Sequence, residues 1–262
     1  MDLHPNQFYH IYNRSNNNEI LFKPSYSENK AMTLISNLIR TIMSIALGCL
    51  FILSCRTNTS DTRVPKLNSL PMYGNLPLSS GYQQANKEFI LFADSIFDHD
   101  RTKASQYYCK HGWDYFRSGF LDTAMFRFNQ AWLLDTTNGR IYWGFADVLS
   151  KKGQYNEAVP FFKRAIKAPP NNSILWREAA LTQGQLFFQT KDIQHLRMSI
   201  DYSMQAIHFD PSNANAYGDL ATAYSYFIQK DSAIKYMHLA DKLDPKVVNP
   251  EVRKLLTGKQ NQ

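Results

Sequence analysis

The sequence predicts an all-α protein, in which four helix-turn-helix repeats stack into an α-solenoid with a capping helix at each end. Three observations support this prediction. Apolar residues recur at steps of three and four, as they do along one face of a helix. Such stretches come in pairs that return every 34 residues over much of the second half. Prolines, which a helix interior does not tolerate, follow the second stretch of most pairs. The first 80 or so residues lack this pattern and are predicted to be largely non-globular.

The clearest repeat is residues 139–172. Its first half places apolar side chains on one helix face, namely those of Tyr142, Phe145, Ala146 and Leu149. Gly153 follows, where the end of a helix favours a residue that tolerates positive φ. A second periodic set then precedes two prolines: Ala158, Phe161, Phe162, Ala165, Ile166, Pro169 and Pro170. Because one helical hairpin cannot cover both of its apolar faces, it needs neighbours.

Small residues recur in register over four stretches, 105–138, 139–172, 173–213 and 214–247. They stand where paired helices must approach closely, at the eighth, twentieth and twenty-seventh places. They are Gly112, Ala124 and Ala131; Ala146, Ala158 and Ala165; Ala180, Ser199 and Ala206; and Ala221, Ala233 and Ala240. The fourth place is aromatic in each stretch: Tyr108, Tyr142, Trp176 and Tyr217. This pattern resembles the tetratricopeptide repeat, a helix-turn-helix unit of about 34 residues. The resemblance implies a non-enzymatic scaffold for protein–protein interaction.

The third repeat departs from the pattern, since it spans 41 residues rather than 34. The extra residues fall around GQLFFQTKDIQHL, between its two predicted helices. We expect a longer first helix or a longer loop there. Gln183 also stands where the other repeats carry Tyr115, Leu149 and Tyr224.

The regions that flank the repeats have distinct compositions. Residues 56–82 are rich in Thr, Ser, Asn and Pro, which predicts a flexible tether. Residues 83–104 contain one amphipathic helix, 84–98, which we interpret as an N-terminal cap. Its apolar face comprises Ala85, Phe89, Phe92, Ala93 and Ile96. Residues 248–262 are predicted to form a C-terminal cap and a tail.

The resemblance to tetratricopeptide repeats also implies a binding groove. In that family the first helix of each pair lines a concave surface that holds a peptide or a helix. Trp beside Arg is typical of binding hot spots, and four groove places carry these residues: Trp113, Arg140, Trp143 and Arg177. As an alternative, Trp113 and Phe116 pack against the 84–98 helix. One subclass of that family grips a C-terminal carboxylate with Lys and Asn at set positions. In this sequence such positions hold Cys109, Trp113 and Gly144, so that mode of binding is not predicted.

Residues 32–55 resemble the signal peptide of a bacterial lipoprotein. Arg40 precedes an almost wholly apolar run, 41–54, which is short for a membrane span. The run ends at Ile52-Leu53-Ser54-Cys55, which resembles a lipobox and implies a lipid on Cys55. Cys49 is a competing site, and an uncleaved anchor or a buried helix is the alternative interpretation. The lipoprotein interpretation requires translation to start at Met32, not Met1.

Residues 1–31 lie outside the repeat pattern. The run QFYHIYNRSNNNEILF resembles the N-terminus of transposases of the single-strand, His-hydrophobic-His nuclease class. In that family the metal-binding His pair and the catalytic Tyr come later, and no His-x-His occurs in this sequence. We therefore assign His10 and Tyr12 to a strand and interpret the stretch as a remnant that is not part of the functional protein.

No pattern in the sequence predicts catalysis, a metal site or a cofactor. Gly-rich phosphate loops, Gly-x-Ser-x-Gly and His-Glu-x-x-His are absent from the sequence. The three cysteines form no metal-binding motif. A net charge of +7 is scattered rather than dense, so no nucleic-acid partner is expected.

The leading hypothesis is therefore a lipid-anchored scaffold of the cell envelope that binds a peptide or protein in its groove. A cytoplasmic or inner-membrane adaptor with an unprocessed signal is the alternative. An inactive, transposase-derived DNA-binding fragment is the alternative of another class.

Overall fold

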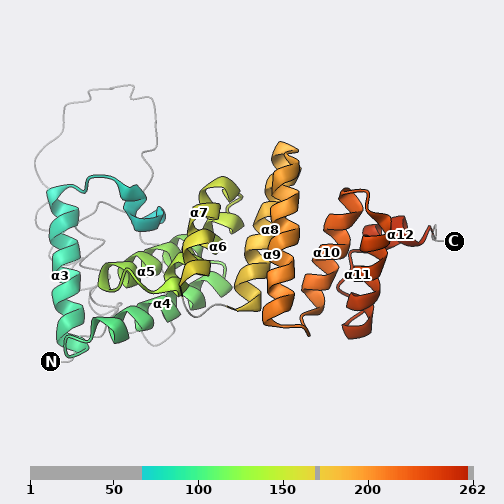
Figure 1. Cartoon of the computed structure of the whole chain (residues 1–262). Coiled ribbons are helices and arrows are strands. Elements are labelled where there is room, and N and C mark those ends of the chain that lie inside the picture. The colour runs from blue at the N-terminus through green and yellow to red at the C-terminus, as the bar shows by residue number, and fades with distance from the viewer. Residues whose placement is uncertain (1–66, 169–171, 259–262) are drawn as a thin grey trace, which may run out of the picture. The chain divides into compact units, whose positions relative to one another are not determined.

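The computed structural model describes residues 67–168 and 172–258 (Figure 1). The predicted signal segment with Cys55, the transposase-like stretch and residues 56–66 of the predicted tether lie outside these ranges. The chain divides into two compact units. In the first, only residues 79–85, the beginning of helix α3 (Ser80–Ile96), are described. The second, residues 65–78 and 86–262, contains all the helical pairs.

Four helical pairs follow one another along this second unit, and every regular element in its described residues is a helix. The pairs are α4 (Arg101–Arg117) with α5 (Leu121–Leu134), α6 (Gly139–Lys151) with α7 (Tyr155–Lys167), α8 (Ser173–Thr190) with α9 (Ile193–Phe209), and α10 (Ala214–Tyr226) with α11 (Lys230–Leu243). From α4 to α11, each helix packs on its pair partner and on the next helix in the chain. The first helices of successive pairs also touch one another. The predicted fold class, an all-α stack of helix-turn-helix repeats, is confirmed.

The small residues recurring in register occupy the crossings between helices. All twelve are buried, from Gly112 in α4 to Ala240 in α11. A tight crossing lies around Phe128, whose side chain is fully buried. A Cβ on Gly112 would lie 2.5 Å from the Phe128 ring, and one on Gly144 would overlap the same ring. Phe128 therefore fills a gap between α4 and α6 that exists because both positions are glycine.

Asparagine and aspartate begin most of the helices. The side chains of Asn138, Asn172 and Asn213 each accept a hydrogen bond from a backbone N–H in the first turn of α6, α8 and α10. These bonds satisfy N–H groups that the helix itself leaves without a partner. The three helices begin at Gly139, Ser173 and Ala214, which are the first residues of the second, third and fourth repeats.

The extra length of the third repeat lies in both of its helices. Helix α8 has 18 residues and α9 has 17, whereas α6 and α7 have 13 each. Both helices are thus longer, although we expected a longer first helix or loop. Gln183, at an otherwise apolar place, is buried and lies 2.8 Å from Nδ1 of His195 across the pair. This contact explains how a polar residue is accommodated there.

A short segment before α3 packs against α5, contrary to the flexible tether predicted for residues 56–82. It contains two 3-10 turns, η1 (Leu67–Ser69) and η2 (Pro71–Asn75). The buried Asn129 amide accepts a hydrogen bond from the Met72 N–H at 2.7 Å and donates to the carbonyls of Asn68 and Leu70 at 3.2 and 2.9 Å. We call residues 67–78 the strap.

Loss of the Asn129 amide is expected to release the strap. Asn129→Ala removes three hydrogen bonds and leaves backbone groups without partners, which should lower the free energy of unfolding by about 2–3 kcal/mol. Urea unfolding measures this change, and limited proteolysis should show faster cleavage within 67–78. Lys163→Ala, at the matching and exposed place of the second repeat, is the control. Unchanged proteolysis of the strap in Asn129→Ala would contradict this role.

Helix α12 (Pro250–Thr257) packs on α10 and α11 at the last repeat, and α3 meets the first repeat through a ring contact. Phe89 of α3 is buried and meets the Tyr108 ring at 5.0 Å between centroids. Ile96, expected on the same apolar face, is 42% exposed instead. At the other end, Val252 and Leu256 of α12 join the core of the fourth repeat. Across the described residues, no helix combines the length and the apolar content that crossing a membrane requires.

Candidate functional site: a cleft between α4 and α6

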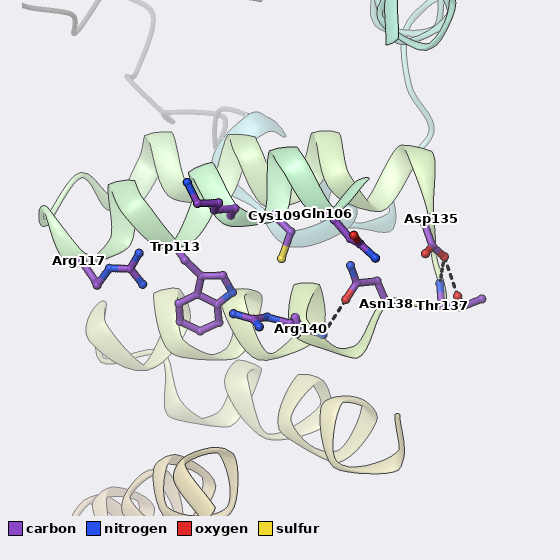
Figure 2. A pocket seen from close by; sticks show the side chains of 9 residues that line it. Gln106, Cys109, Trp113, Arg117, Asp135, Thr137, Asn138 and Arg140 are labelled. Carbon is purple, nitrogen blue, oxygen red and sulfur yellow. Dashed lines mark hydrogen bonds between the residues drawn. The ribbon is translucent and has the colours of Figure 1, made fainter. Parts of the chain in front are cut away.

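A cleft of about 750 Å³ lies along α4, the connection before α6, and the first turn of α6 (Figure 2). Most of its lining comes from the first helices of the first two repeats, the helices that were predicted to face a groove, and the rest comes from the connection before α6. The lining residues are Gln106, Cys109, Lys110, Trp113, Arg117, Asp135, Thr137, Asn138 and Arg140.

Two of the four predicted binding residues, Trp113 and Arg140, line this cleft. Trp113 is only 8% exposed, and its ring packs against Phe128 and Phe116 at centroid distances of 5.4 and 5.6 Å. Trp143, the third, does not line the cleft but meets the Trp113 ring at 4.9 Å. The ring contacts of Trp113 are thus made within α4, α5 and α6, and not with the 84–98 helix of the alternative interpretation. The indole forms one buried wall of the cleft.

The cleft carries an excess of positive charge. Lys110, Arg117 and Arg140 contribute cations, and Asp135 is the one carboxylate in the lining. Asp135 is already engaged, because its Oδ1 accepts bonds from the backbone N–H and the hydroxyl of Thr137. Lys110 and Arg117 share a nearby carboxylate, Asp114, with nitrogen–oxygen distances of 3.9 and 2.5 Å.

Arg140 differs from the other two cations. Its exposed guanidinium has no carboxylate partner in the described part of the chain. The Trp113 Nε1–H, by contrast, is buried beside the Cys109 thiol and is closed to a ligand in the cleft. Since a guanidinium only donates hydrogen bonds, Arg140 presents exposed donors in the cleft that lack a carboxylate acceptor.

Cys109 lines the same cleft but is not suited to nucleophilic chemistry. Burial raises the pKa of its thiol to about 12, and the nearby Arg140 guanidinium and Trp113 indole offset only part of this effect. The thiol is therefore protonated at neutral pH, whereas reactive cysteines depend on a thiolate. In the described residues no group of His, Cys, Asp and Glu is arranged to hold a metal ion.

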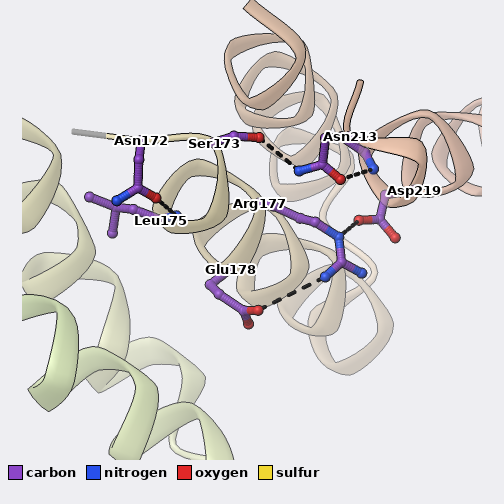
Figure 3. Close-up of polar contacts among 8 residues, drawn as sticks. Asn172, Ser173, Leu175, Arg177, Glu178, Asn213 and Asp219 are labelled. Carbon is purple, nitrogen blue, oxygen red and sulfur yellow. Dashed lines mark hydrogen bonds and ion pairs between the residues drawn. The ribbon is translucent and has the colours of Figure 1, made fainter. Parts of the chain in front are cut away.

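Arg177, the fourth predicted binding residue, links two helices (Figure 3). Its Nε lies 2.7 Å from Oδ2 of Asp219 in α10, and its Nη1 lies 3.9 Å from Glu178. At 24% and 22% exposed, both members of the Arg177–Asp219 pair are half-buried. The guanidinium is therefore already occupied by a carboxylate. Sequence reasoning missed Asp219 and Glu178, both at the sixth place of their repeats.

Three carboxyl groups on the first helices have raised pKa values. Burial raises the pKa of Asp147 well above its usual range, and nearby Glu178 adds to the effect. Burial also raises the pKa of Glu178. The pKa of Asp219 rises to about 6, because burial outweighs the attraction of Arg177. The folded chain therefore holds these protons more tightly than the unfolded chain does.

Because the pKa of Asp219 is higher in the folded chain, ionisation of Asp219 is expected to lower the free energy of unfolding as the pH rises. Its contribution to stability is complete below the unfolded pKa of about 4 and disappears as the pH rises through about 6. Relative to wild type, Asp219→Asn should therefore gain about 1 kcal/mol in the free energy of unfolding between pH 5 and pH 7. Urea unfolding of both proteins at the two pH values measures this gain. A constant difference would contradict the assignment.

Residues 139–172 match the family model of the tetratricopeptide repeat. This stretch is the clearest repeat of the sequence and forms α6 and α7. The repeat is typical of non-enzymatic scaffolds that bind proteins or peptides. No curated protein matches the chain.

Solved structures are similar to this chain at low sequence identity. PilF from Pseudomonas aeruginosa is 16% identical with a TM-score of 0.50, covering 60% of this chain and 68% of its own. YrrB, described as a TPR protein with an unusual peptide-binding site, is 18% identical with a TM-score of 0.49, covering 59% of this chain and 75% of its own. MamA is 19% identical with a TM-score of 0.49, covering 65% of this chain and 98% of its own. At these identities the likeness concerns the fold alone.

Proposed function

We propose that this protein is a scaffold that binds a segment of a partner protein in the cleft between α4 and α6. The observation that carries the proposal is an exposed Arg140 guanidinium, without a carboxylate partner among the described residues, in one cleft with the Trp113 ring. A fixed aromatic wall beside a guanidinium supplies both contact area and directional hydrogen bonds. Trp143 supports the wall from α6.

The chemistry of the lining favours an acidic segment. A carboxylate can accept two parallel hydrogen bonds from a guanidinium, a strong and directional pairing. Lys110 and Arg117 add positive charge at the same cleft, while Asp135 is held by Thr137. An Asp or Glu side chain of the partner therefore suits the position in front of Arg140.

Selection from a library of displayed random peptides tests this function directly. Full-length protein is expected to enrich peptides that carry Asp or Glu next to an apolar residue. The same selection with Arg140→Ala should lose that enrichment, while circular dichroism shows unchanged helicity, since Arg140 is exposed. Enrichment of basic peptides, or the same peptides with both proteins, would contradict the proposal.

For location, we propose that a lipid on Cys55 holds the scaffold at the cell envelope, with a cytoplasmic adaptor as the alternative. The support is the sequence of residues 32–55 alone. Labelling with a radioactive fatty acid should mark the wild type and Cys49→Ala but not Cys55→Ala. Equal labelling of Cys55→Ala would refute the lipoprotein interpretation without affecting the cleft.

A further inference from the structure

The turn between α10 and α11 presents an apolar residue in an unfavourable conformation. Ile228 has a φ of 59° and is 91% exposed. The matching turns of the first and second repeats carry Gly119 and Gly153, with φ values of 81° and 76°. A β-branched residue at positive φ is strained, and an exposed one makes no packing contact in return. Neither the backbone conformation of the turn nor packing in the core explains why position 228 holds isoleucine.

Two exposed aromatic rings accompany Ile228. Tyr226, the last residue of α10, is 48% exposed, and Phe188 at the end of α8 is 40% exposed. The two rings meet edge to face at 5.0 Å between centroids. Phe188 lies in the part of α8 by which the third repeat exceeds the usual length. Phe188 and Tyr226 thus form one exposed aromatic pair, and Ile228 follows Tyr226 by two residues; we call Phe188, Tyr226 and Ile228 the turn patch.

One cation contacts the turn patch, and two more lie at or near its turn. Lys191 Nζ lies 5.7 Å from the centre of the Phe188 ring, and the Arg197 guanidinium lies 5.5 Å from that of Phe227. Lys230 follows Ile228 by two residues and is exposed. None of these three cations has a carboxylate partner within residues 67–168 and 172–258.

The neighbouring carboxylates are placed where helices bind negative charge. Asp192 accepts a hydrogen bond from the Gln194 N–H as the N-cap of α9. Asp231 lies in the first turn of α11, where the helix end carries partial positive charge. The cations around the patch therefore keep their charge available for an external partner.

We propose that the turn patch inserts into the interface of an anionic lipid membrane. An apolar side chain projecting from a tight turn can enter the acyl boundary, and aromatic rings favour the headgroup level behind it. Flanking Lys and Arg then meet anionic headgroups. The charge complementarity of the three unpaired cations favours this occupant over a second copy of the chain, which would bring the same cations together. The inference is independent of the cleft and of a lipid on Cys55.

A fluorescent probe beside the patch tests this inference in the full-length chain. A nitrobenzoxadiazole amino acid replaces Gln229, an exposed residue whose side chain caps no helix. With phosphatidylserine vesicles that contain brominated lipid, the probe should shift to the blue and lose at least half of its emission. The same probe at Leu255, which is 65% exposed on α12, is the control and should not respond. Any anchoring through the N-terminal region affects both positions alike.

The Ile228→Gly background separates insertion from folding. Glycine relieves the strained turn, so this variant should raise the Tm by about 2–4 °C and yet abolish quenching of the probe at position 229. Phosphatidylcholine vesicles should quench the wild-type background far less. The inference is overturned if quenching at position 229 is absent, persists in Ile228→Gly, or is equal at position 255. A blue shift without vesicles, together with a doubled mass by light scattering, would indicate a dimer interface and also overturns it.

Discussion

Replacing Phe128 with alanine is expected to lower the free energy of unfolding by about 3–5 kcal/mol, the range for a large aromatic side chain removed from a core. Phe128 has no exposed surface, and its ring contacts Trp113 and Phe145 at centroid distances of 5.4 and 6.3 Å. It comes from α5 and fills the gap formed by Gly112 of α4 and Gly144 of α6. The loss should therefore loosen both the first repeat and its junction with the second.

Urea unfolding followed by circular dichroism measures this loss. Phe120→Ala is the matched control, since Phe120 is 60% exposed and its removal should change stability by less than about 1 kcal/mol. Gly144→Ala should also destabilise the fold, because its methyl group would enter the Phe128 ring. If Phe128→Ala were as stable as Phe120→Ala, the proposed crossing of α4, α5 and α6 would be wrong.

Reversing the charge of Arg140 is expected to weaken binding of an acidic peptide by about 100-fold, as loss of a close charge pair and the repulsion that replaces it can cost about 3 kcal/mol. Stability should be unaffected, because Arg140 is exposed and has no ion-pair partner in the described residues. Isothermal titration of Arg140→Glu with a peptide from the display selection gives the affinity.

The control for Arg140→Glu is Lys163→Glu, an equal change of charge at an exposed residue of α7 that does not line the cleft. It should bind the peptide within about threefold of wild type, since long-range charge effects are screened at physiological salt. Equal weakening by both substitutions would mean that the peptide responds to net charge and not to the cleft.

The repeat stack was predictable because its signal is local and periodic. Small residues at fixed places mark helix crossings, and asparagines mark the helix starts that the structure shows at Gly139, Ser173 and Ala214. The strap was not predictable. It depends on Asn129, and the matching places of the second and fourth repeats hold the exposed Lys163 and His238. A single asparagine in an amphipathic helix does not reveal that a distant segment will cover it.

The cleft was predictable in part. The resemblance placed Trp113 and Arg140 on helices that face the groove, and both line the cleft. Arg177 also stands at a predicted groove position, but its side chain pairs with Asp219, 42 residues further along the chain. Which charges pair between helices depends on side-chain reach across a crossing, and periodicity does not contain that information. The burial of Trp113 likewise follows from the glycines that admit Phe128 beside it.

The most direct test of the cleft as the binding surface is photo-cross-linking of the full-length protein in its own cells. A photoreactive benzoylphenylalanine at Gln106, an exposed residue of the cleft lining, should yield a covalent adduct with a partner protein that mass spectrometry identifies. The same group at Lys163 should not, and Arg140→Glu should abolish the adduct formed at position 106. Adducts that form at position 163 but not at 106, or that survive Arg140→Glu, would contradict the account.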